Sequence, residues 1–242
     1  MKKIAIKFAV ILVAFLLVGA ATDIYTDIFG NPLSKQKSEN NIISYIIDNY
    51  ATNNFSVSDI VYDRENKEYG AVIEFTDSED SVFYVAYSPK DNMIKDTYID
   101  NVASGYNTFI RLNAEYGRIV SNALSEYYTD DNVMYYGELG KNTSLSDYSN
   151  TLYPDMPFDM YNLPLEATVS LFADSEDTSA NRFAYDLSEL QKLMYYNDIA
   201  VDYYDIMYNG TVLLEDFPSA VVVEYLEDTE GLAEKVEEYL NK

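Results

Sequence analysis

The sequence predicts an α+β fold: an N-terminal transmembrane helix, then a helix-plus-antiparallel-meander half and a ferredoxin-like βαββα half. Three observations predict it. A charge-free apolar run opens the chain. The apolar period alternates between 3.6 and 2 residues in both halves, as in chains that mix helices with strands. Prolines at 154, 157 and 164 interrupt regular structure between the halves. The expected segments are a membrane anchor or signal segment (1–30), a helix and β-meander domain (31–128), an irregular connection (129–164) and a ferredoxin-like domain (165–242).

The first 30 residues have the pattern of a membrane-spanning helix. Three lysines fall within the first seven residues, and residues 8–22 are uncharged. Counted from Ile4, with Lys7 snorkelling, the run has 19 residues and reaches about 28 Å as a helix, close to the hydrocarbon core of a bilayer. Basic residues before the run and Asp23 and Asp27 after it orient the N-terminus inward. The body is then expected outside the cytoplasm, on a single-pass membrane protein.

A cleaved signal peptide is the alternative for the same segment. The small residues over 18–20 would serve as the cleavage site, and the chain would then be secreted. A retained anchor would instead continue toward Phe29. The chain has no cysteine for lipid attachment. Both interpretations predict export.

One amphipathic helix on an antiparallel meander of about four strands is expected in the first half. Asn31 and Pro32 are typical of a helix start, with Asn at the cap and Pro at the first helical position. The apolar residues that share one face of this helix are Ile42, Ile43, Ile46, Ile47 and Tyr50. The strands are expected at 55–62, 71–75, 82–87 and, more weakly, 93–99.

The longest helix is expected over 100–128 and closes the first half. An apolar stripe runs along it, and Gly105 weakens it slightly. The connection that follows has a short strand candidate at 134–139. Its prolines forbid long regular elements, so we expect an ordered linker between the two halves.

The second half regains a regular pattern of strands and helices. Asn209-Gly210 is the strongest short hairpin signal in the chain. The remaining elements are strands at 167–173, 199–208, 212–214 and 221–223, and helices at 179–197 and 230–240, the first with Phe183, Leu187, Leu190 and Met194 inward. Strand, helix, two strands and helix suggest a split, ferredoxin-like sandwich.

Several short segments occur in a familiar combination. Asn31-Pro32 follows the N-terminal apolar segment, the run 105–112 continues into Glu115-Tyr116, and an acidic turn at 174–179 opens the βαββα tail. This combination resembles the YfjL-like family of bacterial membrane-anchored proteins. The resemblance implies a retained anchor and a two-part α+β body outside the membrane. It brings no activity and no catalytic residue with it.

The composition excludes several classes of function. The chain has 41 acidic and 16 basic residues, a net charge of −25, and no Cys, His or Trp. The chain therefore cannot form a thiolate nucleophile, a His/Cys zinc site or a Ser-His-Asp triad. Nucleic acid is a poor partner because its phosphates require many Lys and Arg contacts. The motifs of nucleotide binding are missing from the sequence, so no nucleotide and no cofactor are expected.

Pairs of Asp and Glu residues are the only abundant groups in the sequence that could act in catalysis. They occur at Asp77/Glu79/Asp80, Asp130/Asp131, Asp174/Glu176/Asp177 and Glu215/Asp216. Acids in turns usually cap backbone N–H groups or stay solvated, so no catalytic residue is assigned. Calcium takes oxygen ligands, and Asp174, Glu176 and Asp177 are weak candidates for it, although acids at that position also favour a helix start.

The 25 tyrosines admit two interpretations, a stacking surface for sugars or peptides and half-buried packing positions. The sequence as a whole predicts a non-enzymatic extracytoplasmic protein anchored by its N-terminus, an interaction module that contacts an envelope protein or wall component. The alternatives are a carboxylate-based hydrolase of cell-surface glycans and a calcium-stabilised secreted structural module.

Overall fold

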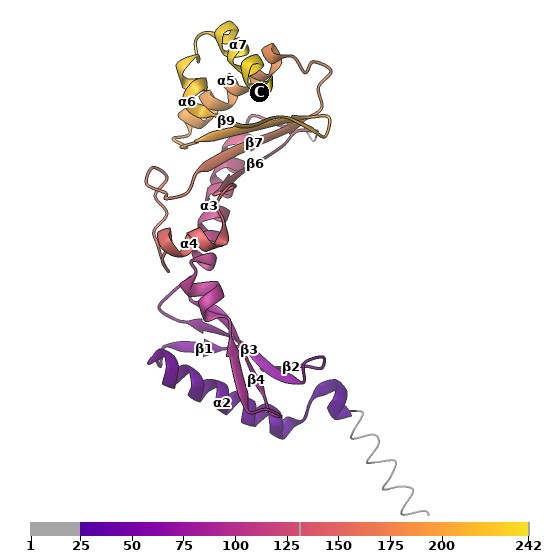
Figure 1. The fold of residues 1–242 in the computed structure, drawn as a ribbon, viewed down its shortest axis with the longest axis vertical. Coiled ribbons are helices and arrows are strands. Elements are labelled where there is room, and N and C mark those ends of the chain that lie inside the picture. The colour runs from indigo at the N-terminus through magenta and orange to yellow at the C-terminus, as the bar shows by residue number, and fades with distance from the viewer. Residues whose placement is uncertain (1–24, 131, 242) are drawn as a thin grey trace, which may run out of the picture. The chain divides into compact units, whose positions relative to one another are not determined.

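The computed structural model describes residues 25–130 and 132–241. The chain divides into two compact units, Met1–Ala103 and Ser104–Lys242. Each unit has its own β-sheet and its own hydrophobic core. Figure 1 shows the elements of both units.

The first unit is one long helix on a five-stranded antiparallel sheet. Its elements are α2 (Pro32–Tyr50), β1 (Phe55–Val57), β2 (Val61–Asp63), β3 (Glu68–Phe75), β4 (Val82–Ser88), β5 (Met93–Asp96) and the π-helical turn η1 (Ile99–Ala103). The strand order is β1-β3-β4-β5, and β2 also pairs with β3. The expected strand over 55–62 is therefore two short strands that pair with different parts of β3.

Helix α2 begins as the sequence predicts. The Asn31 side chain accepts a hydrogen bond from the Leu33 backbone N–H at 2.9 Å, and Pro32 occupies the first turn. Ile42 and Ile46 are fully buried against the sheet. Ile47 was expected on the same face but is 41% exposed. It lies one residue, about 100° of helical rotation, beyond Ile46 and so leaves the buried stripe.

The transmembrane helix of the predicted fold class needs correction. In the ranges that the structure describes, no helix is both long and apolar enough to cross a membrane. Helices α2 and α3 (Tyr106–Ser125) are long but amphipathic, with charged residues such as Lys35 and Arg118 on their exposed faces. The expected segment falls mostly on residues 1–24, which lie outside the described residues. For residues 25–130 and 132–241 the fold class is therefore corrected to α+β with two sheets and no membrane-spanning helix.

The second unit is a four-stranded mixed sheet with helices packed on one face. Its elements are α3, β6 (Met134–Leu139), α4 (Leu145–Thr151), β7 (Ala167–Ala173), α5 (Ala180–Tyr196), β8 (Tyr203–Tyr208), β9 (Thr211–Pro218), α6 (Ser219–Glu224) and α7 (Thr229–Leu240). The strand order is β6-β7-β8-β9. Strands β7 and β8 are parallel, and the other neighbours are antiparallel.

The expected ferredoxin-like arrangement is wrong in its topology. A split βαβ unit holds another strand between its two parallel strands. Here β7 and β8, joined by α5, are direct neighbours. The expected strand at 221–223 is also wrong, because these residues form α6 and Val222 is fully buried. Strand β9 ends at Pro218, which lacks the N–H that a ladder needs.

The boundary between the units differs in position from the predicted connection. Gly105 adopts φ +77 and separates the π-helical turn from α3, so the expected helix over 100–128 is interrupted. Helix α3 then packs on β6, where Tyr116 and Val120 lie against Gly137. The predicted connection at 129–164 thus supplies β6 and α4 to the second unit.

The core of the second unit lies between its helices and the inner face of the sheet. On β8, Tyr204, Ile206 and Tyr208 are at most 1% exposed and alternate with outward side chains. The four residues expected inward on α5, Phe183, Leu187, Leu190 and Met194, are all fully buried. These inward strand residues share one core with buried residues of α3, α5 and α7, so the inner face of the sheet is the face toward those helices.

The predicted hairpin is confirmed, and it gives a first testable expectation. Asn209 and Gly210 have φ of +55 and +71, as a type I′ turn requires. A Cβ at Gly210 would meet nothing within 4 Å, so a substitution there costs only backbone strain. We expect Gly210→Val to lower the unfolding free energy by about 1–2 kcal/mol. Gly210→Asn is the control, because Asn tolerates positive φ; equal melting temperatures for both variants would contradict the turn.

Candidate functional site

The three calcium candidates lie in the loop between β7 and α5. The Asp177 side chain accepts a hydrogen bond from the Ser179 backbone N–H at 2.9 Å, and this bond lowers the pKa of the Asp177 carboxyl. Ser179 in turn caps α5. Asp174 and Glu176 lie in the same loop, and nowhere in the described residues is there a group of three or more acidic side chains that could hold a metal ion. The position of Asp177 thus fits a helix start.

Asn209 has a second role that the hairpin signal did not reveal. Its side-chain oxygen accepts a hydrogen bond from the Ser175 N–H at 3.1 Å, and its amide donates to the Ser175 carbonyl at 2.8 Å. These two bonds fasten the β7–α5 loop to the β8–β9 turn. Asn209 therefore orders the acidic loop as well as the hairpin.

The other carboxylate groups are mostly scattered. Asp77, Glu79 and Asp80 lie in the β3–β4 turn of the first unit, and Asp130 lies in the turn after α3. Asp131 is outside the described residues. Glu215 and Asp216, on β9, join charged side chains from other parts of the chain.

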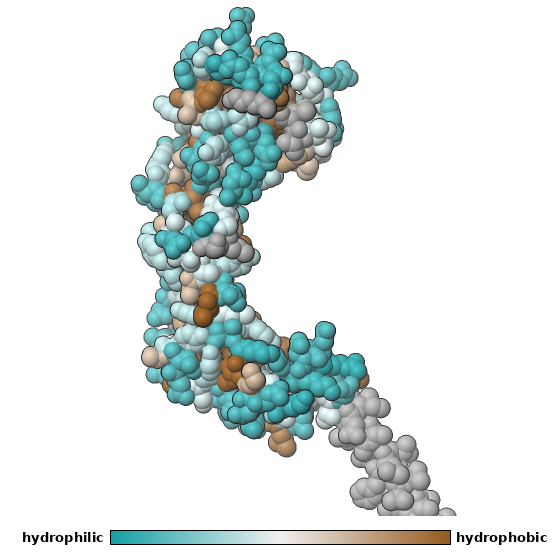
Figure 2. All heavy atoms as spheres, in the orientation of Figure 1, coloured by the Kyte–Doolittle hydropathy of each residue, from teal (hydrophilic) through white to brown (hydrophobic). Residues whose placement is uncertain are grey.

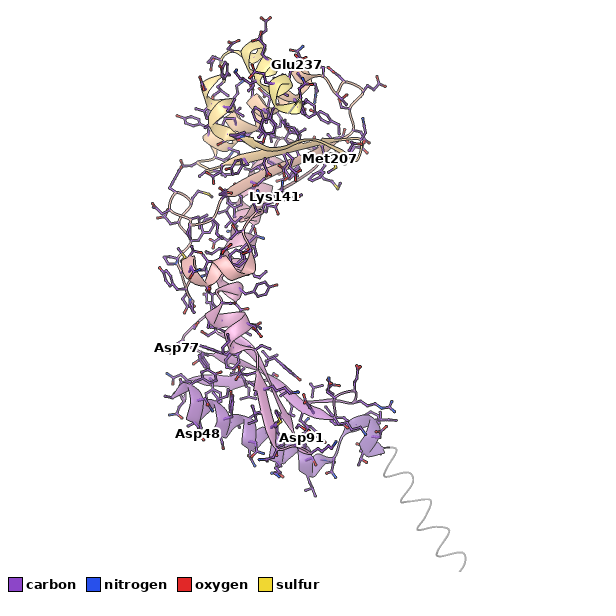
Figure 3. All side chains as sticks on the ribbon, viewed as in Figure 1. Asp48, Asp77, Asp91, Lys141, Met207 and Glu237 are labelled. Carbon is purple, nitrogen blue, oxygen red and sulfur yellow. The ribbon has the colours of Figure 1, made fainter. Side chains whose placement is uncertain are left out.

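A single lysine gathers this group of acids. The Lys141 Nζ atom lies 2.7 Å from a carboxylate oxygen of Asp205 and 3.1 Å from those of Glu215 and Asp216. Asp205 also accepts hydrogen bonds from the Ser170 hydroxyl and the Asp216 backbone N–H. We name Lys141, Asp205, Glu215 and Asp216 the Lys141 cluster. Figure 3 labels its lysine beside the sheet.

The carboxylates of the Lys141 cluster keep the Lys141 side chain protonated. Burial by itself would lower the pKa of the Lys141 ammonium, but hydrogen bonds to Asp205, Glu215 and Asp216 outweigh burial and raise it. Lys141 is therefore held as a cation and is unsuited to act as a nucleophile or base, which requires a lowered pKa. Nearby, burial raises the pKa of Glu138, and the charges of Asp205 and Asp216 add to that rise while Lys141 opposes it.

An apolar row crosses the same face of the sheet. Met134 pairs with Phe172, and Phe172 pairs with Met207, across three strands. The Tyr136 ring stacks on Phe172 with 5.4 Å between ring centroids. Met134 and Tyr136 are 66% and 42% exposed. We name Met134, Tyr136, Phe172 and Met207 the apolar row.

The apolar row and the Lys141 cluster share the outer face of the sheet. Met207 and Asp205 are two residues apart on β8, so their side chains point to the same side. That side is opposite to Tyr204 and Ile206, which face the helices. Figure 3 labels Met207 and Lys141, one from each group. In the view of Figure 2, hydrophilic side chains cover most of the surface.

The domain arrangement matches one family across most of the chain. A YfjL-like N-terminal domain matches residues 2–99, and a YfjL-like C-terminal domain matches residues 115–241. The chain belongs to the YfjL-like family. This confirms the family resemblance seen in the sequence. No curated protein and no solved structure matched the chain.

The two YfjL-like domains coincide with the two units of the structure. The N-terminal domain lies within the first unit, and the C-terminal domain lies within the second and carries the outer face described above. Each domain also has an open pocket. The pocket of the YfjL-like C-terminal domain lies between α3 and the α5–β8 loop and includes Glu126, and that of the N-terminal domain lies beside α2 and includes Asp48.

Proposed function

We propose that this YfjL-like protein is a non-enzymatic interaction module whose C-terminal domain binds a basic, amphipathic segment of a partner protein. The observation that carries the proposal is the outer face of the second sheet. It places the apolar row beside the Lys141 cluster and Glu138. The helices of the domain pack on the opposite face. On this face Met134 and Tyr136 are 66% and 42% exposed, whereas Ser170, beneath the Lys141 cluster, is buried.

The apolar row supplies the contact area. Methionine side chains are flexible and polarisable, so a surface with two of them adapts to differently shaped apolar partners. Tyr136 and Phe172 add a rigid aromatic pair. An exposed apolar group beside polar residues is typical of a protein interaction site.

The charges next to the row favour a basic partner. Glu138, Asp205, Glu215 and Asp216 carry four carboxylates, and Lys141 compensates only one of them. The whole chain has a net charge of −25, which attracts cationic partners at long range and repels anionic ones. A segment with Lys or Arg beside apolar residues complements both parts of the face.

The pockets support a binding role over the glycan hydrolase alternative. Glycoside hydrolysis needs two carboxylates facing each other, about 5–10 Å apart, across the substrate. Each of the two pockets includes one carboxylate, Glu126 in one and Asp48 in the other. Lys141 is locked as a cation by its three partners, which disfavours covalent chemistry there.

We place the partner outside the cytoplasm, as a component of the cell envelope. The support for this location is the sequence of the first 30 residues, in which lysines precede an apolar stretch and acids follow it. This pattern is typical of exported chains.

Peptide binding tests the proposed surface. The probe is a fluorescent helical peptide that alternates Lys and Leu at amphipathic spacing, and a Glu/Leu peptide of equal length is the comparison. We expect Met134→Gln in the full chain to weaken binding of the Lys/Leu peptide about tenfold, because the exposed thioether that the bound peptide would cover is replaced by an amide. Added salt is expected to weaken binding further.

Met93→Gln is the matched control, since Met93 is 55% exposed on β5 of the other domain. It is expected to leave the dissociation constant unchanged. The proposal is overturned if Met134→Gln and Met93→Gln bind the Lys/Leu peptide with the same dissociation constant. It is also overturned if the unmodified chain binds the Glu/Leu peptide as tightly as the Lys/Leu peptide.

A further inference from the structure

The N-terminal domain has a polar pocket that the proposed protein interaction does not use. It is an open hollow of about 260 Å³ between α2 and the β4–β5 hairpin. Five of its lining residues come from α2 at positions 41, 44, 45, 48 and 49. This spacing of three and four residues places them on one face of the helix. The other side of the pocket is formed by Tyr87, Asn92 and Ile94.

The lining side chains are rich in neutral hydrogen-bonding groups. Asn41, Asn49 and Asn92 each carry a carboxamide. The Asn49 amide donates one hydrogen bond to the Tyr45 carbonyl at 2.9 Å, and the Asn92 oxygen accepts one from Tyr87. Because a carboxamide has two N–H groups and two lone pairs on its oxygen, each retains a donor and an acceptor for a ligand. Ser44 adds a hydroxyl, and Asp48 adds acceptor oxygens. Adjacent hydroxyl groups of a sugar ring offer the complementary pairs of donors and acceptors.

The charge of the pocket selects against anionic ligands. Among the described residues that line the pocket, Asp48 carries the only carboxylate, and none is Lys or Arg. A phosphate or carboxylate in the pocket would meet repulsion from Asp48 without a compensating cation. The lining therefore favours a neutral ligand with many hydroxyls.

Hydrogen bonds of the two lining tyrosines, Tyr45 and Tyr87, fix the wall of the pocket. The buried Tyr87 donates a hydrogen bond to the Asn92 side-chain oxygen at 2.8 Å, which anchors Asn92 in its φ +54 conformation. Tyr45 and Tyr50 both donate to the Asp96 carboxylate, so the Tyr45 ring is fixed at its hydroxyl end. A fixed aromatic ring beside carboxamides gives a sugar an apolar surface for its C–H groups at little entropic cost.

From this arrangement we infer that the pocket binds a neutral saccharide, one sugar unit of a glycan. Its volume is below the 300–1,000 Å³ that is typical of pockets for drug-sized ligands, which fits a single ring with its neighbours in solvent. The inference does not depend on the C-terminal interaction surface, because the residues involved belong to the other domain.

Titration of the full chain with sugars tests the inference. The probes are N-acetylglucosamine and methyl glucoside, with glucuronate as a charged sugar of similar ring size, each followed by calorimetry or ligand-observed NMR. We expect the neutral sugars to bind with millimolar dissociation constants or better, and glucuronate to bind at least about tenfold more weakly.

Variants on α2 identify the site. Asn41→Ala is expected to weaken binding of the neutral sugar about tenfold, while Asn40→Ala, one residue away on the same helix and exposed, should leave it unchanged. Asp48→Asn should raise the affinity for glucuronate toward that for the neutral sugar, because it removes the repelling charge. Melting temperatures of all three variants show that they are folded.

The inference is overturned if neither neutral sugar binds at about 10 mM, which corresponds to a binding free energy weaker than about −3 kcal/mol. It is equally overturned if Asn40→Ala and Asn41→Ala bind alike, or if glucuronate binds the unmodified chain as well as the neutral sugars do.

Discussion

Replacing Gly137 with valine should lower the unfolding free energy of the C-terminal domain by at least about 3 kcal/mol. A Cβ at this position would lie 2.6 Å from Cγ2 and 2.8 Å from Cβ of Val120, and 2.9 Å from Cε1 of Tyr116. Val120 and Tyr116 are both fully buried, so neither side chain has free space to move into. The close approach of α3 to β6 therefore requires glycine. Urea unfolding of the full chain, followed by circular dichroism, measures the loss.

A double substitution separates steric overlap from other effects of removing the glycine. Gly137→Ala alone and Val120→Ala alone should each destabilise the domain, the first by overlap and the second by a cavity. In the double variant, the methyl group added at position 137 occupies part of the space that the Val120 side chain leaves. The double variant should therefore lose less unfolding free energy than the sum of the losses in the two single variants. Strictly additive losses would show that Gly137 and Val120 are not coupled.

Tyr208→Phe should cost about 2–3 kcal/mol of unfolding free energy at neutral pH. The Tyr208 hydroxyl donates to the Asp186 carboxylate, and the Arg182 Nε atom lies 3.0 Å from the same oxygen. Asp186 is only 3% exposed. Removing the hydroxyl leaves a buried carboxylate with one donor fewer, which is costlier than losing an exposed hydrogen bond.

The loss caused by Tyr208→Phe should depend on pH. Burial raises the pKa of Asp186 above its ordinary value of 3.8, and the hydrogen bonds from Tyr208 and Arg182 oppose that rise. Without Tyr208 the folded-state pKa rises further. The folded state then binds a proton more readily than the unfolded state, so this group's contribution to stability decreases as pH rises through the folded-state pKa. The difference in unfolding free energy between the unmodified chain and Tyr208→Phe should be largest at neutral pH and shrink as pH falls toward 3.8.

Urea unfolding at about pH 7.5 and about pH 5, each compared with the unmodified chain at the same pH, measures this dependence. Tyr203→Phe is the control, because Tyr203 lies on the outer side of β8 and its hydroxyl makes one long bond to Glu166 at 3.4 Å. We expect no change in stability from it. A deficit for Tyr208→Phe that is equal at both pH values, or larger in acid, would contradict the role of Asp186.

Local signals in the sequence predicted local structure well. The Asn31 cap, the apolar stripe of α5 and the Asn209-Gly210 turn each depend on residues within a few positions of one another. Val221–Val223 show the limit of such signals. These β-branched residues favour a strand, but Pro218 ends the ladder and burial of Val222 favours a helix. Tertiary packing decides the outcome there.

Arrangements set by distant residues could not be predicted in this way. The spacing of strands and helices does not reveal whether β7 and β8 are neighbours, so the split topology was wrong. Likewise, the sequence identified Glu215 and Asp216 as a pair but gave no reason to connect them with Lys141, more than 70 positions earlier. The excess of acids over bases was the only signal that a lone lysine would be surrounded by carboxylates.

The sharp boundary between the units has a consequence for biosynthesis. The sheet of the first unit uses strands from 55–96 and that of the second uses strands from 134–218, so neither sheet needs a strand from the other unit. Translation at roughly 5–20 residues per second takes roughly 7–28 s to add residues 104–242. Small two-state domains generally fold in about a second or less, so we expect the helix-on-sheet first unit to fold within that time once it has left the ribosome. The nascent N-terminal domain can therefore reach its native state while most of the C-terminal domain is still unmade, which limits wrong strand pairing between the two sheets.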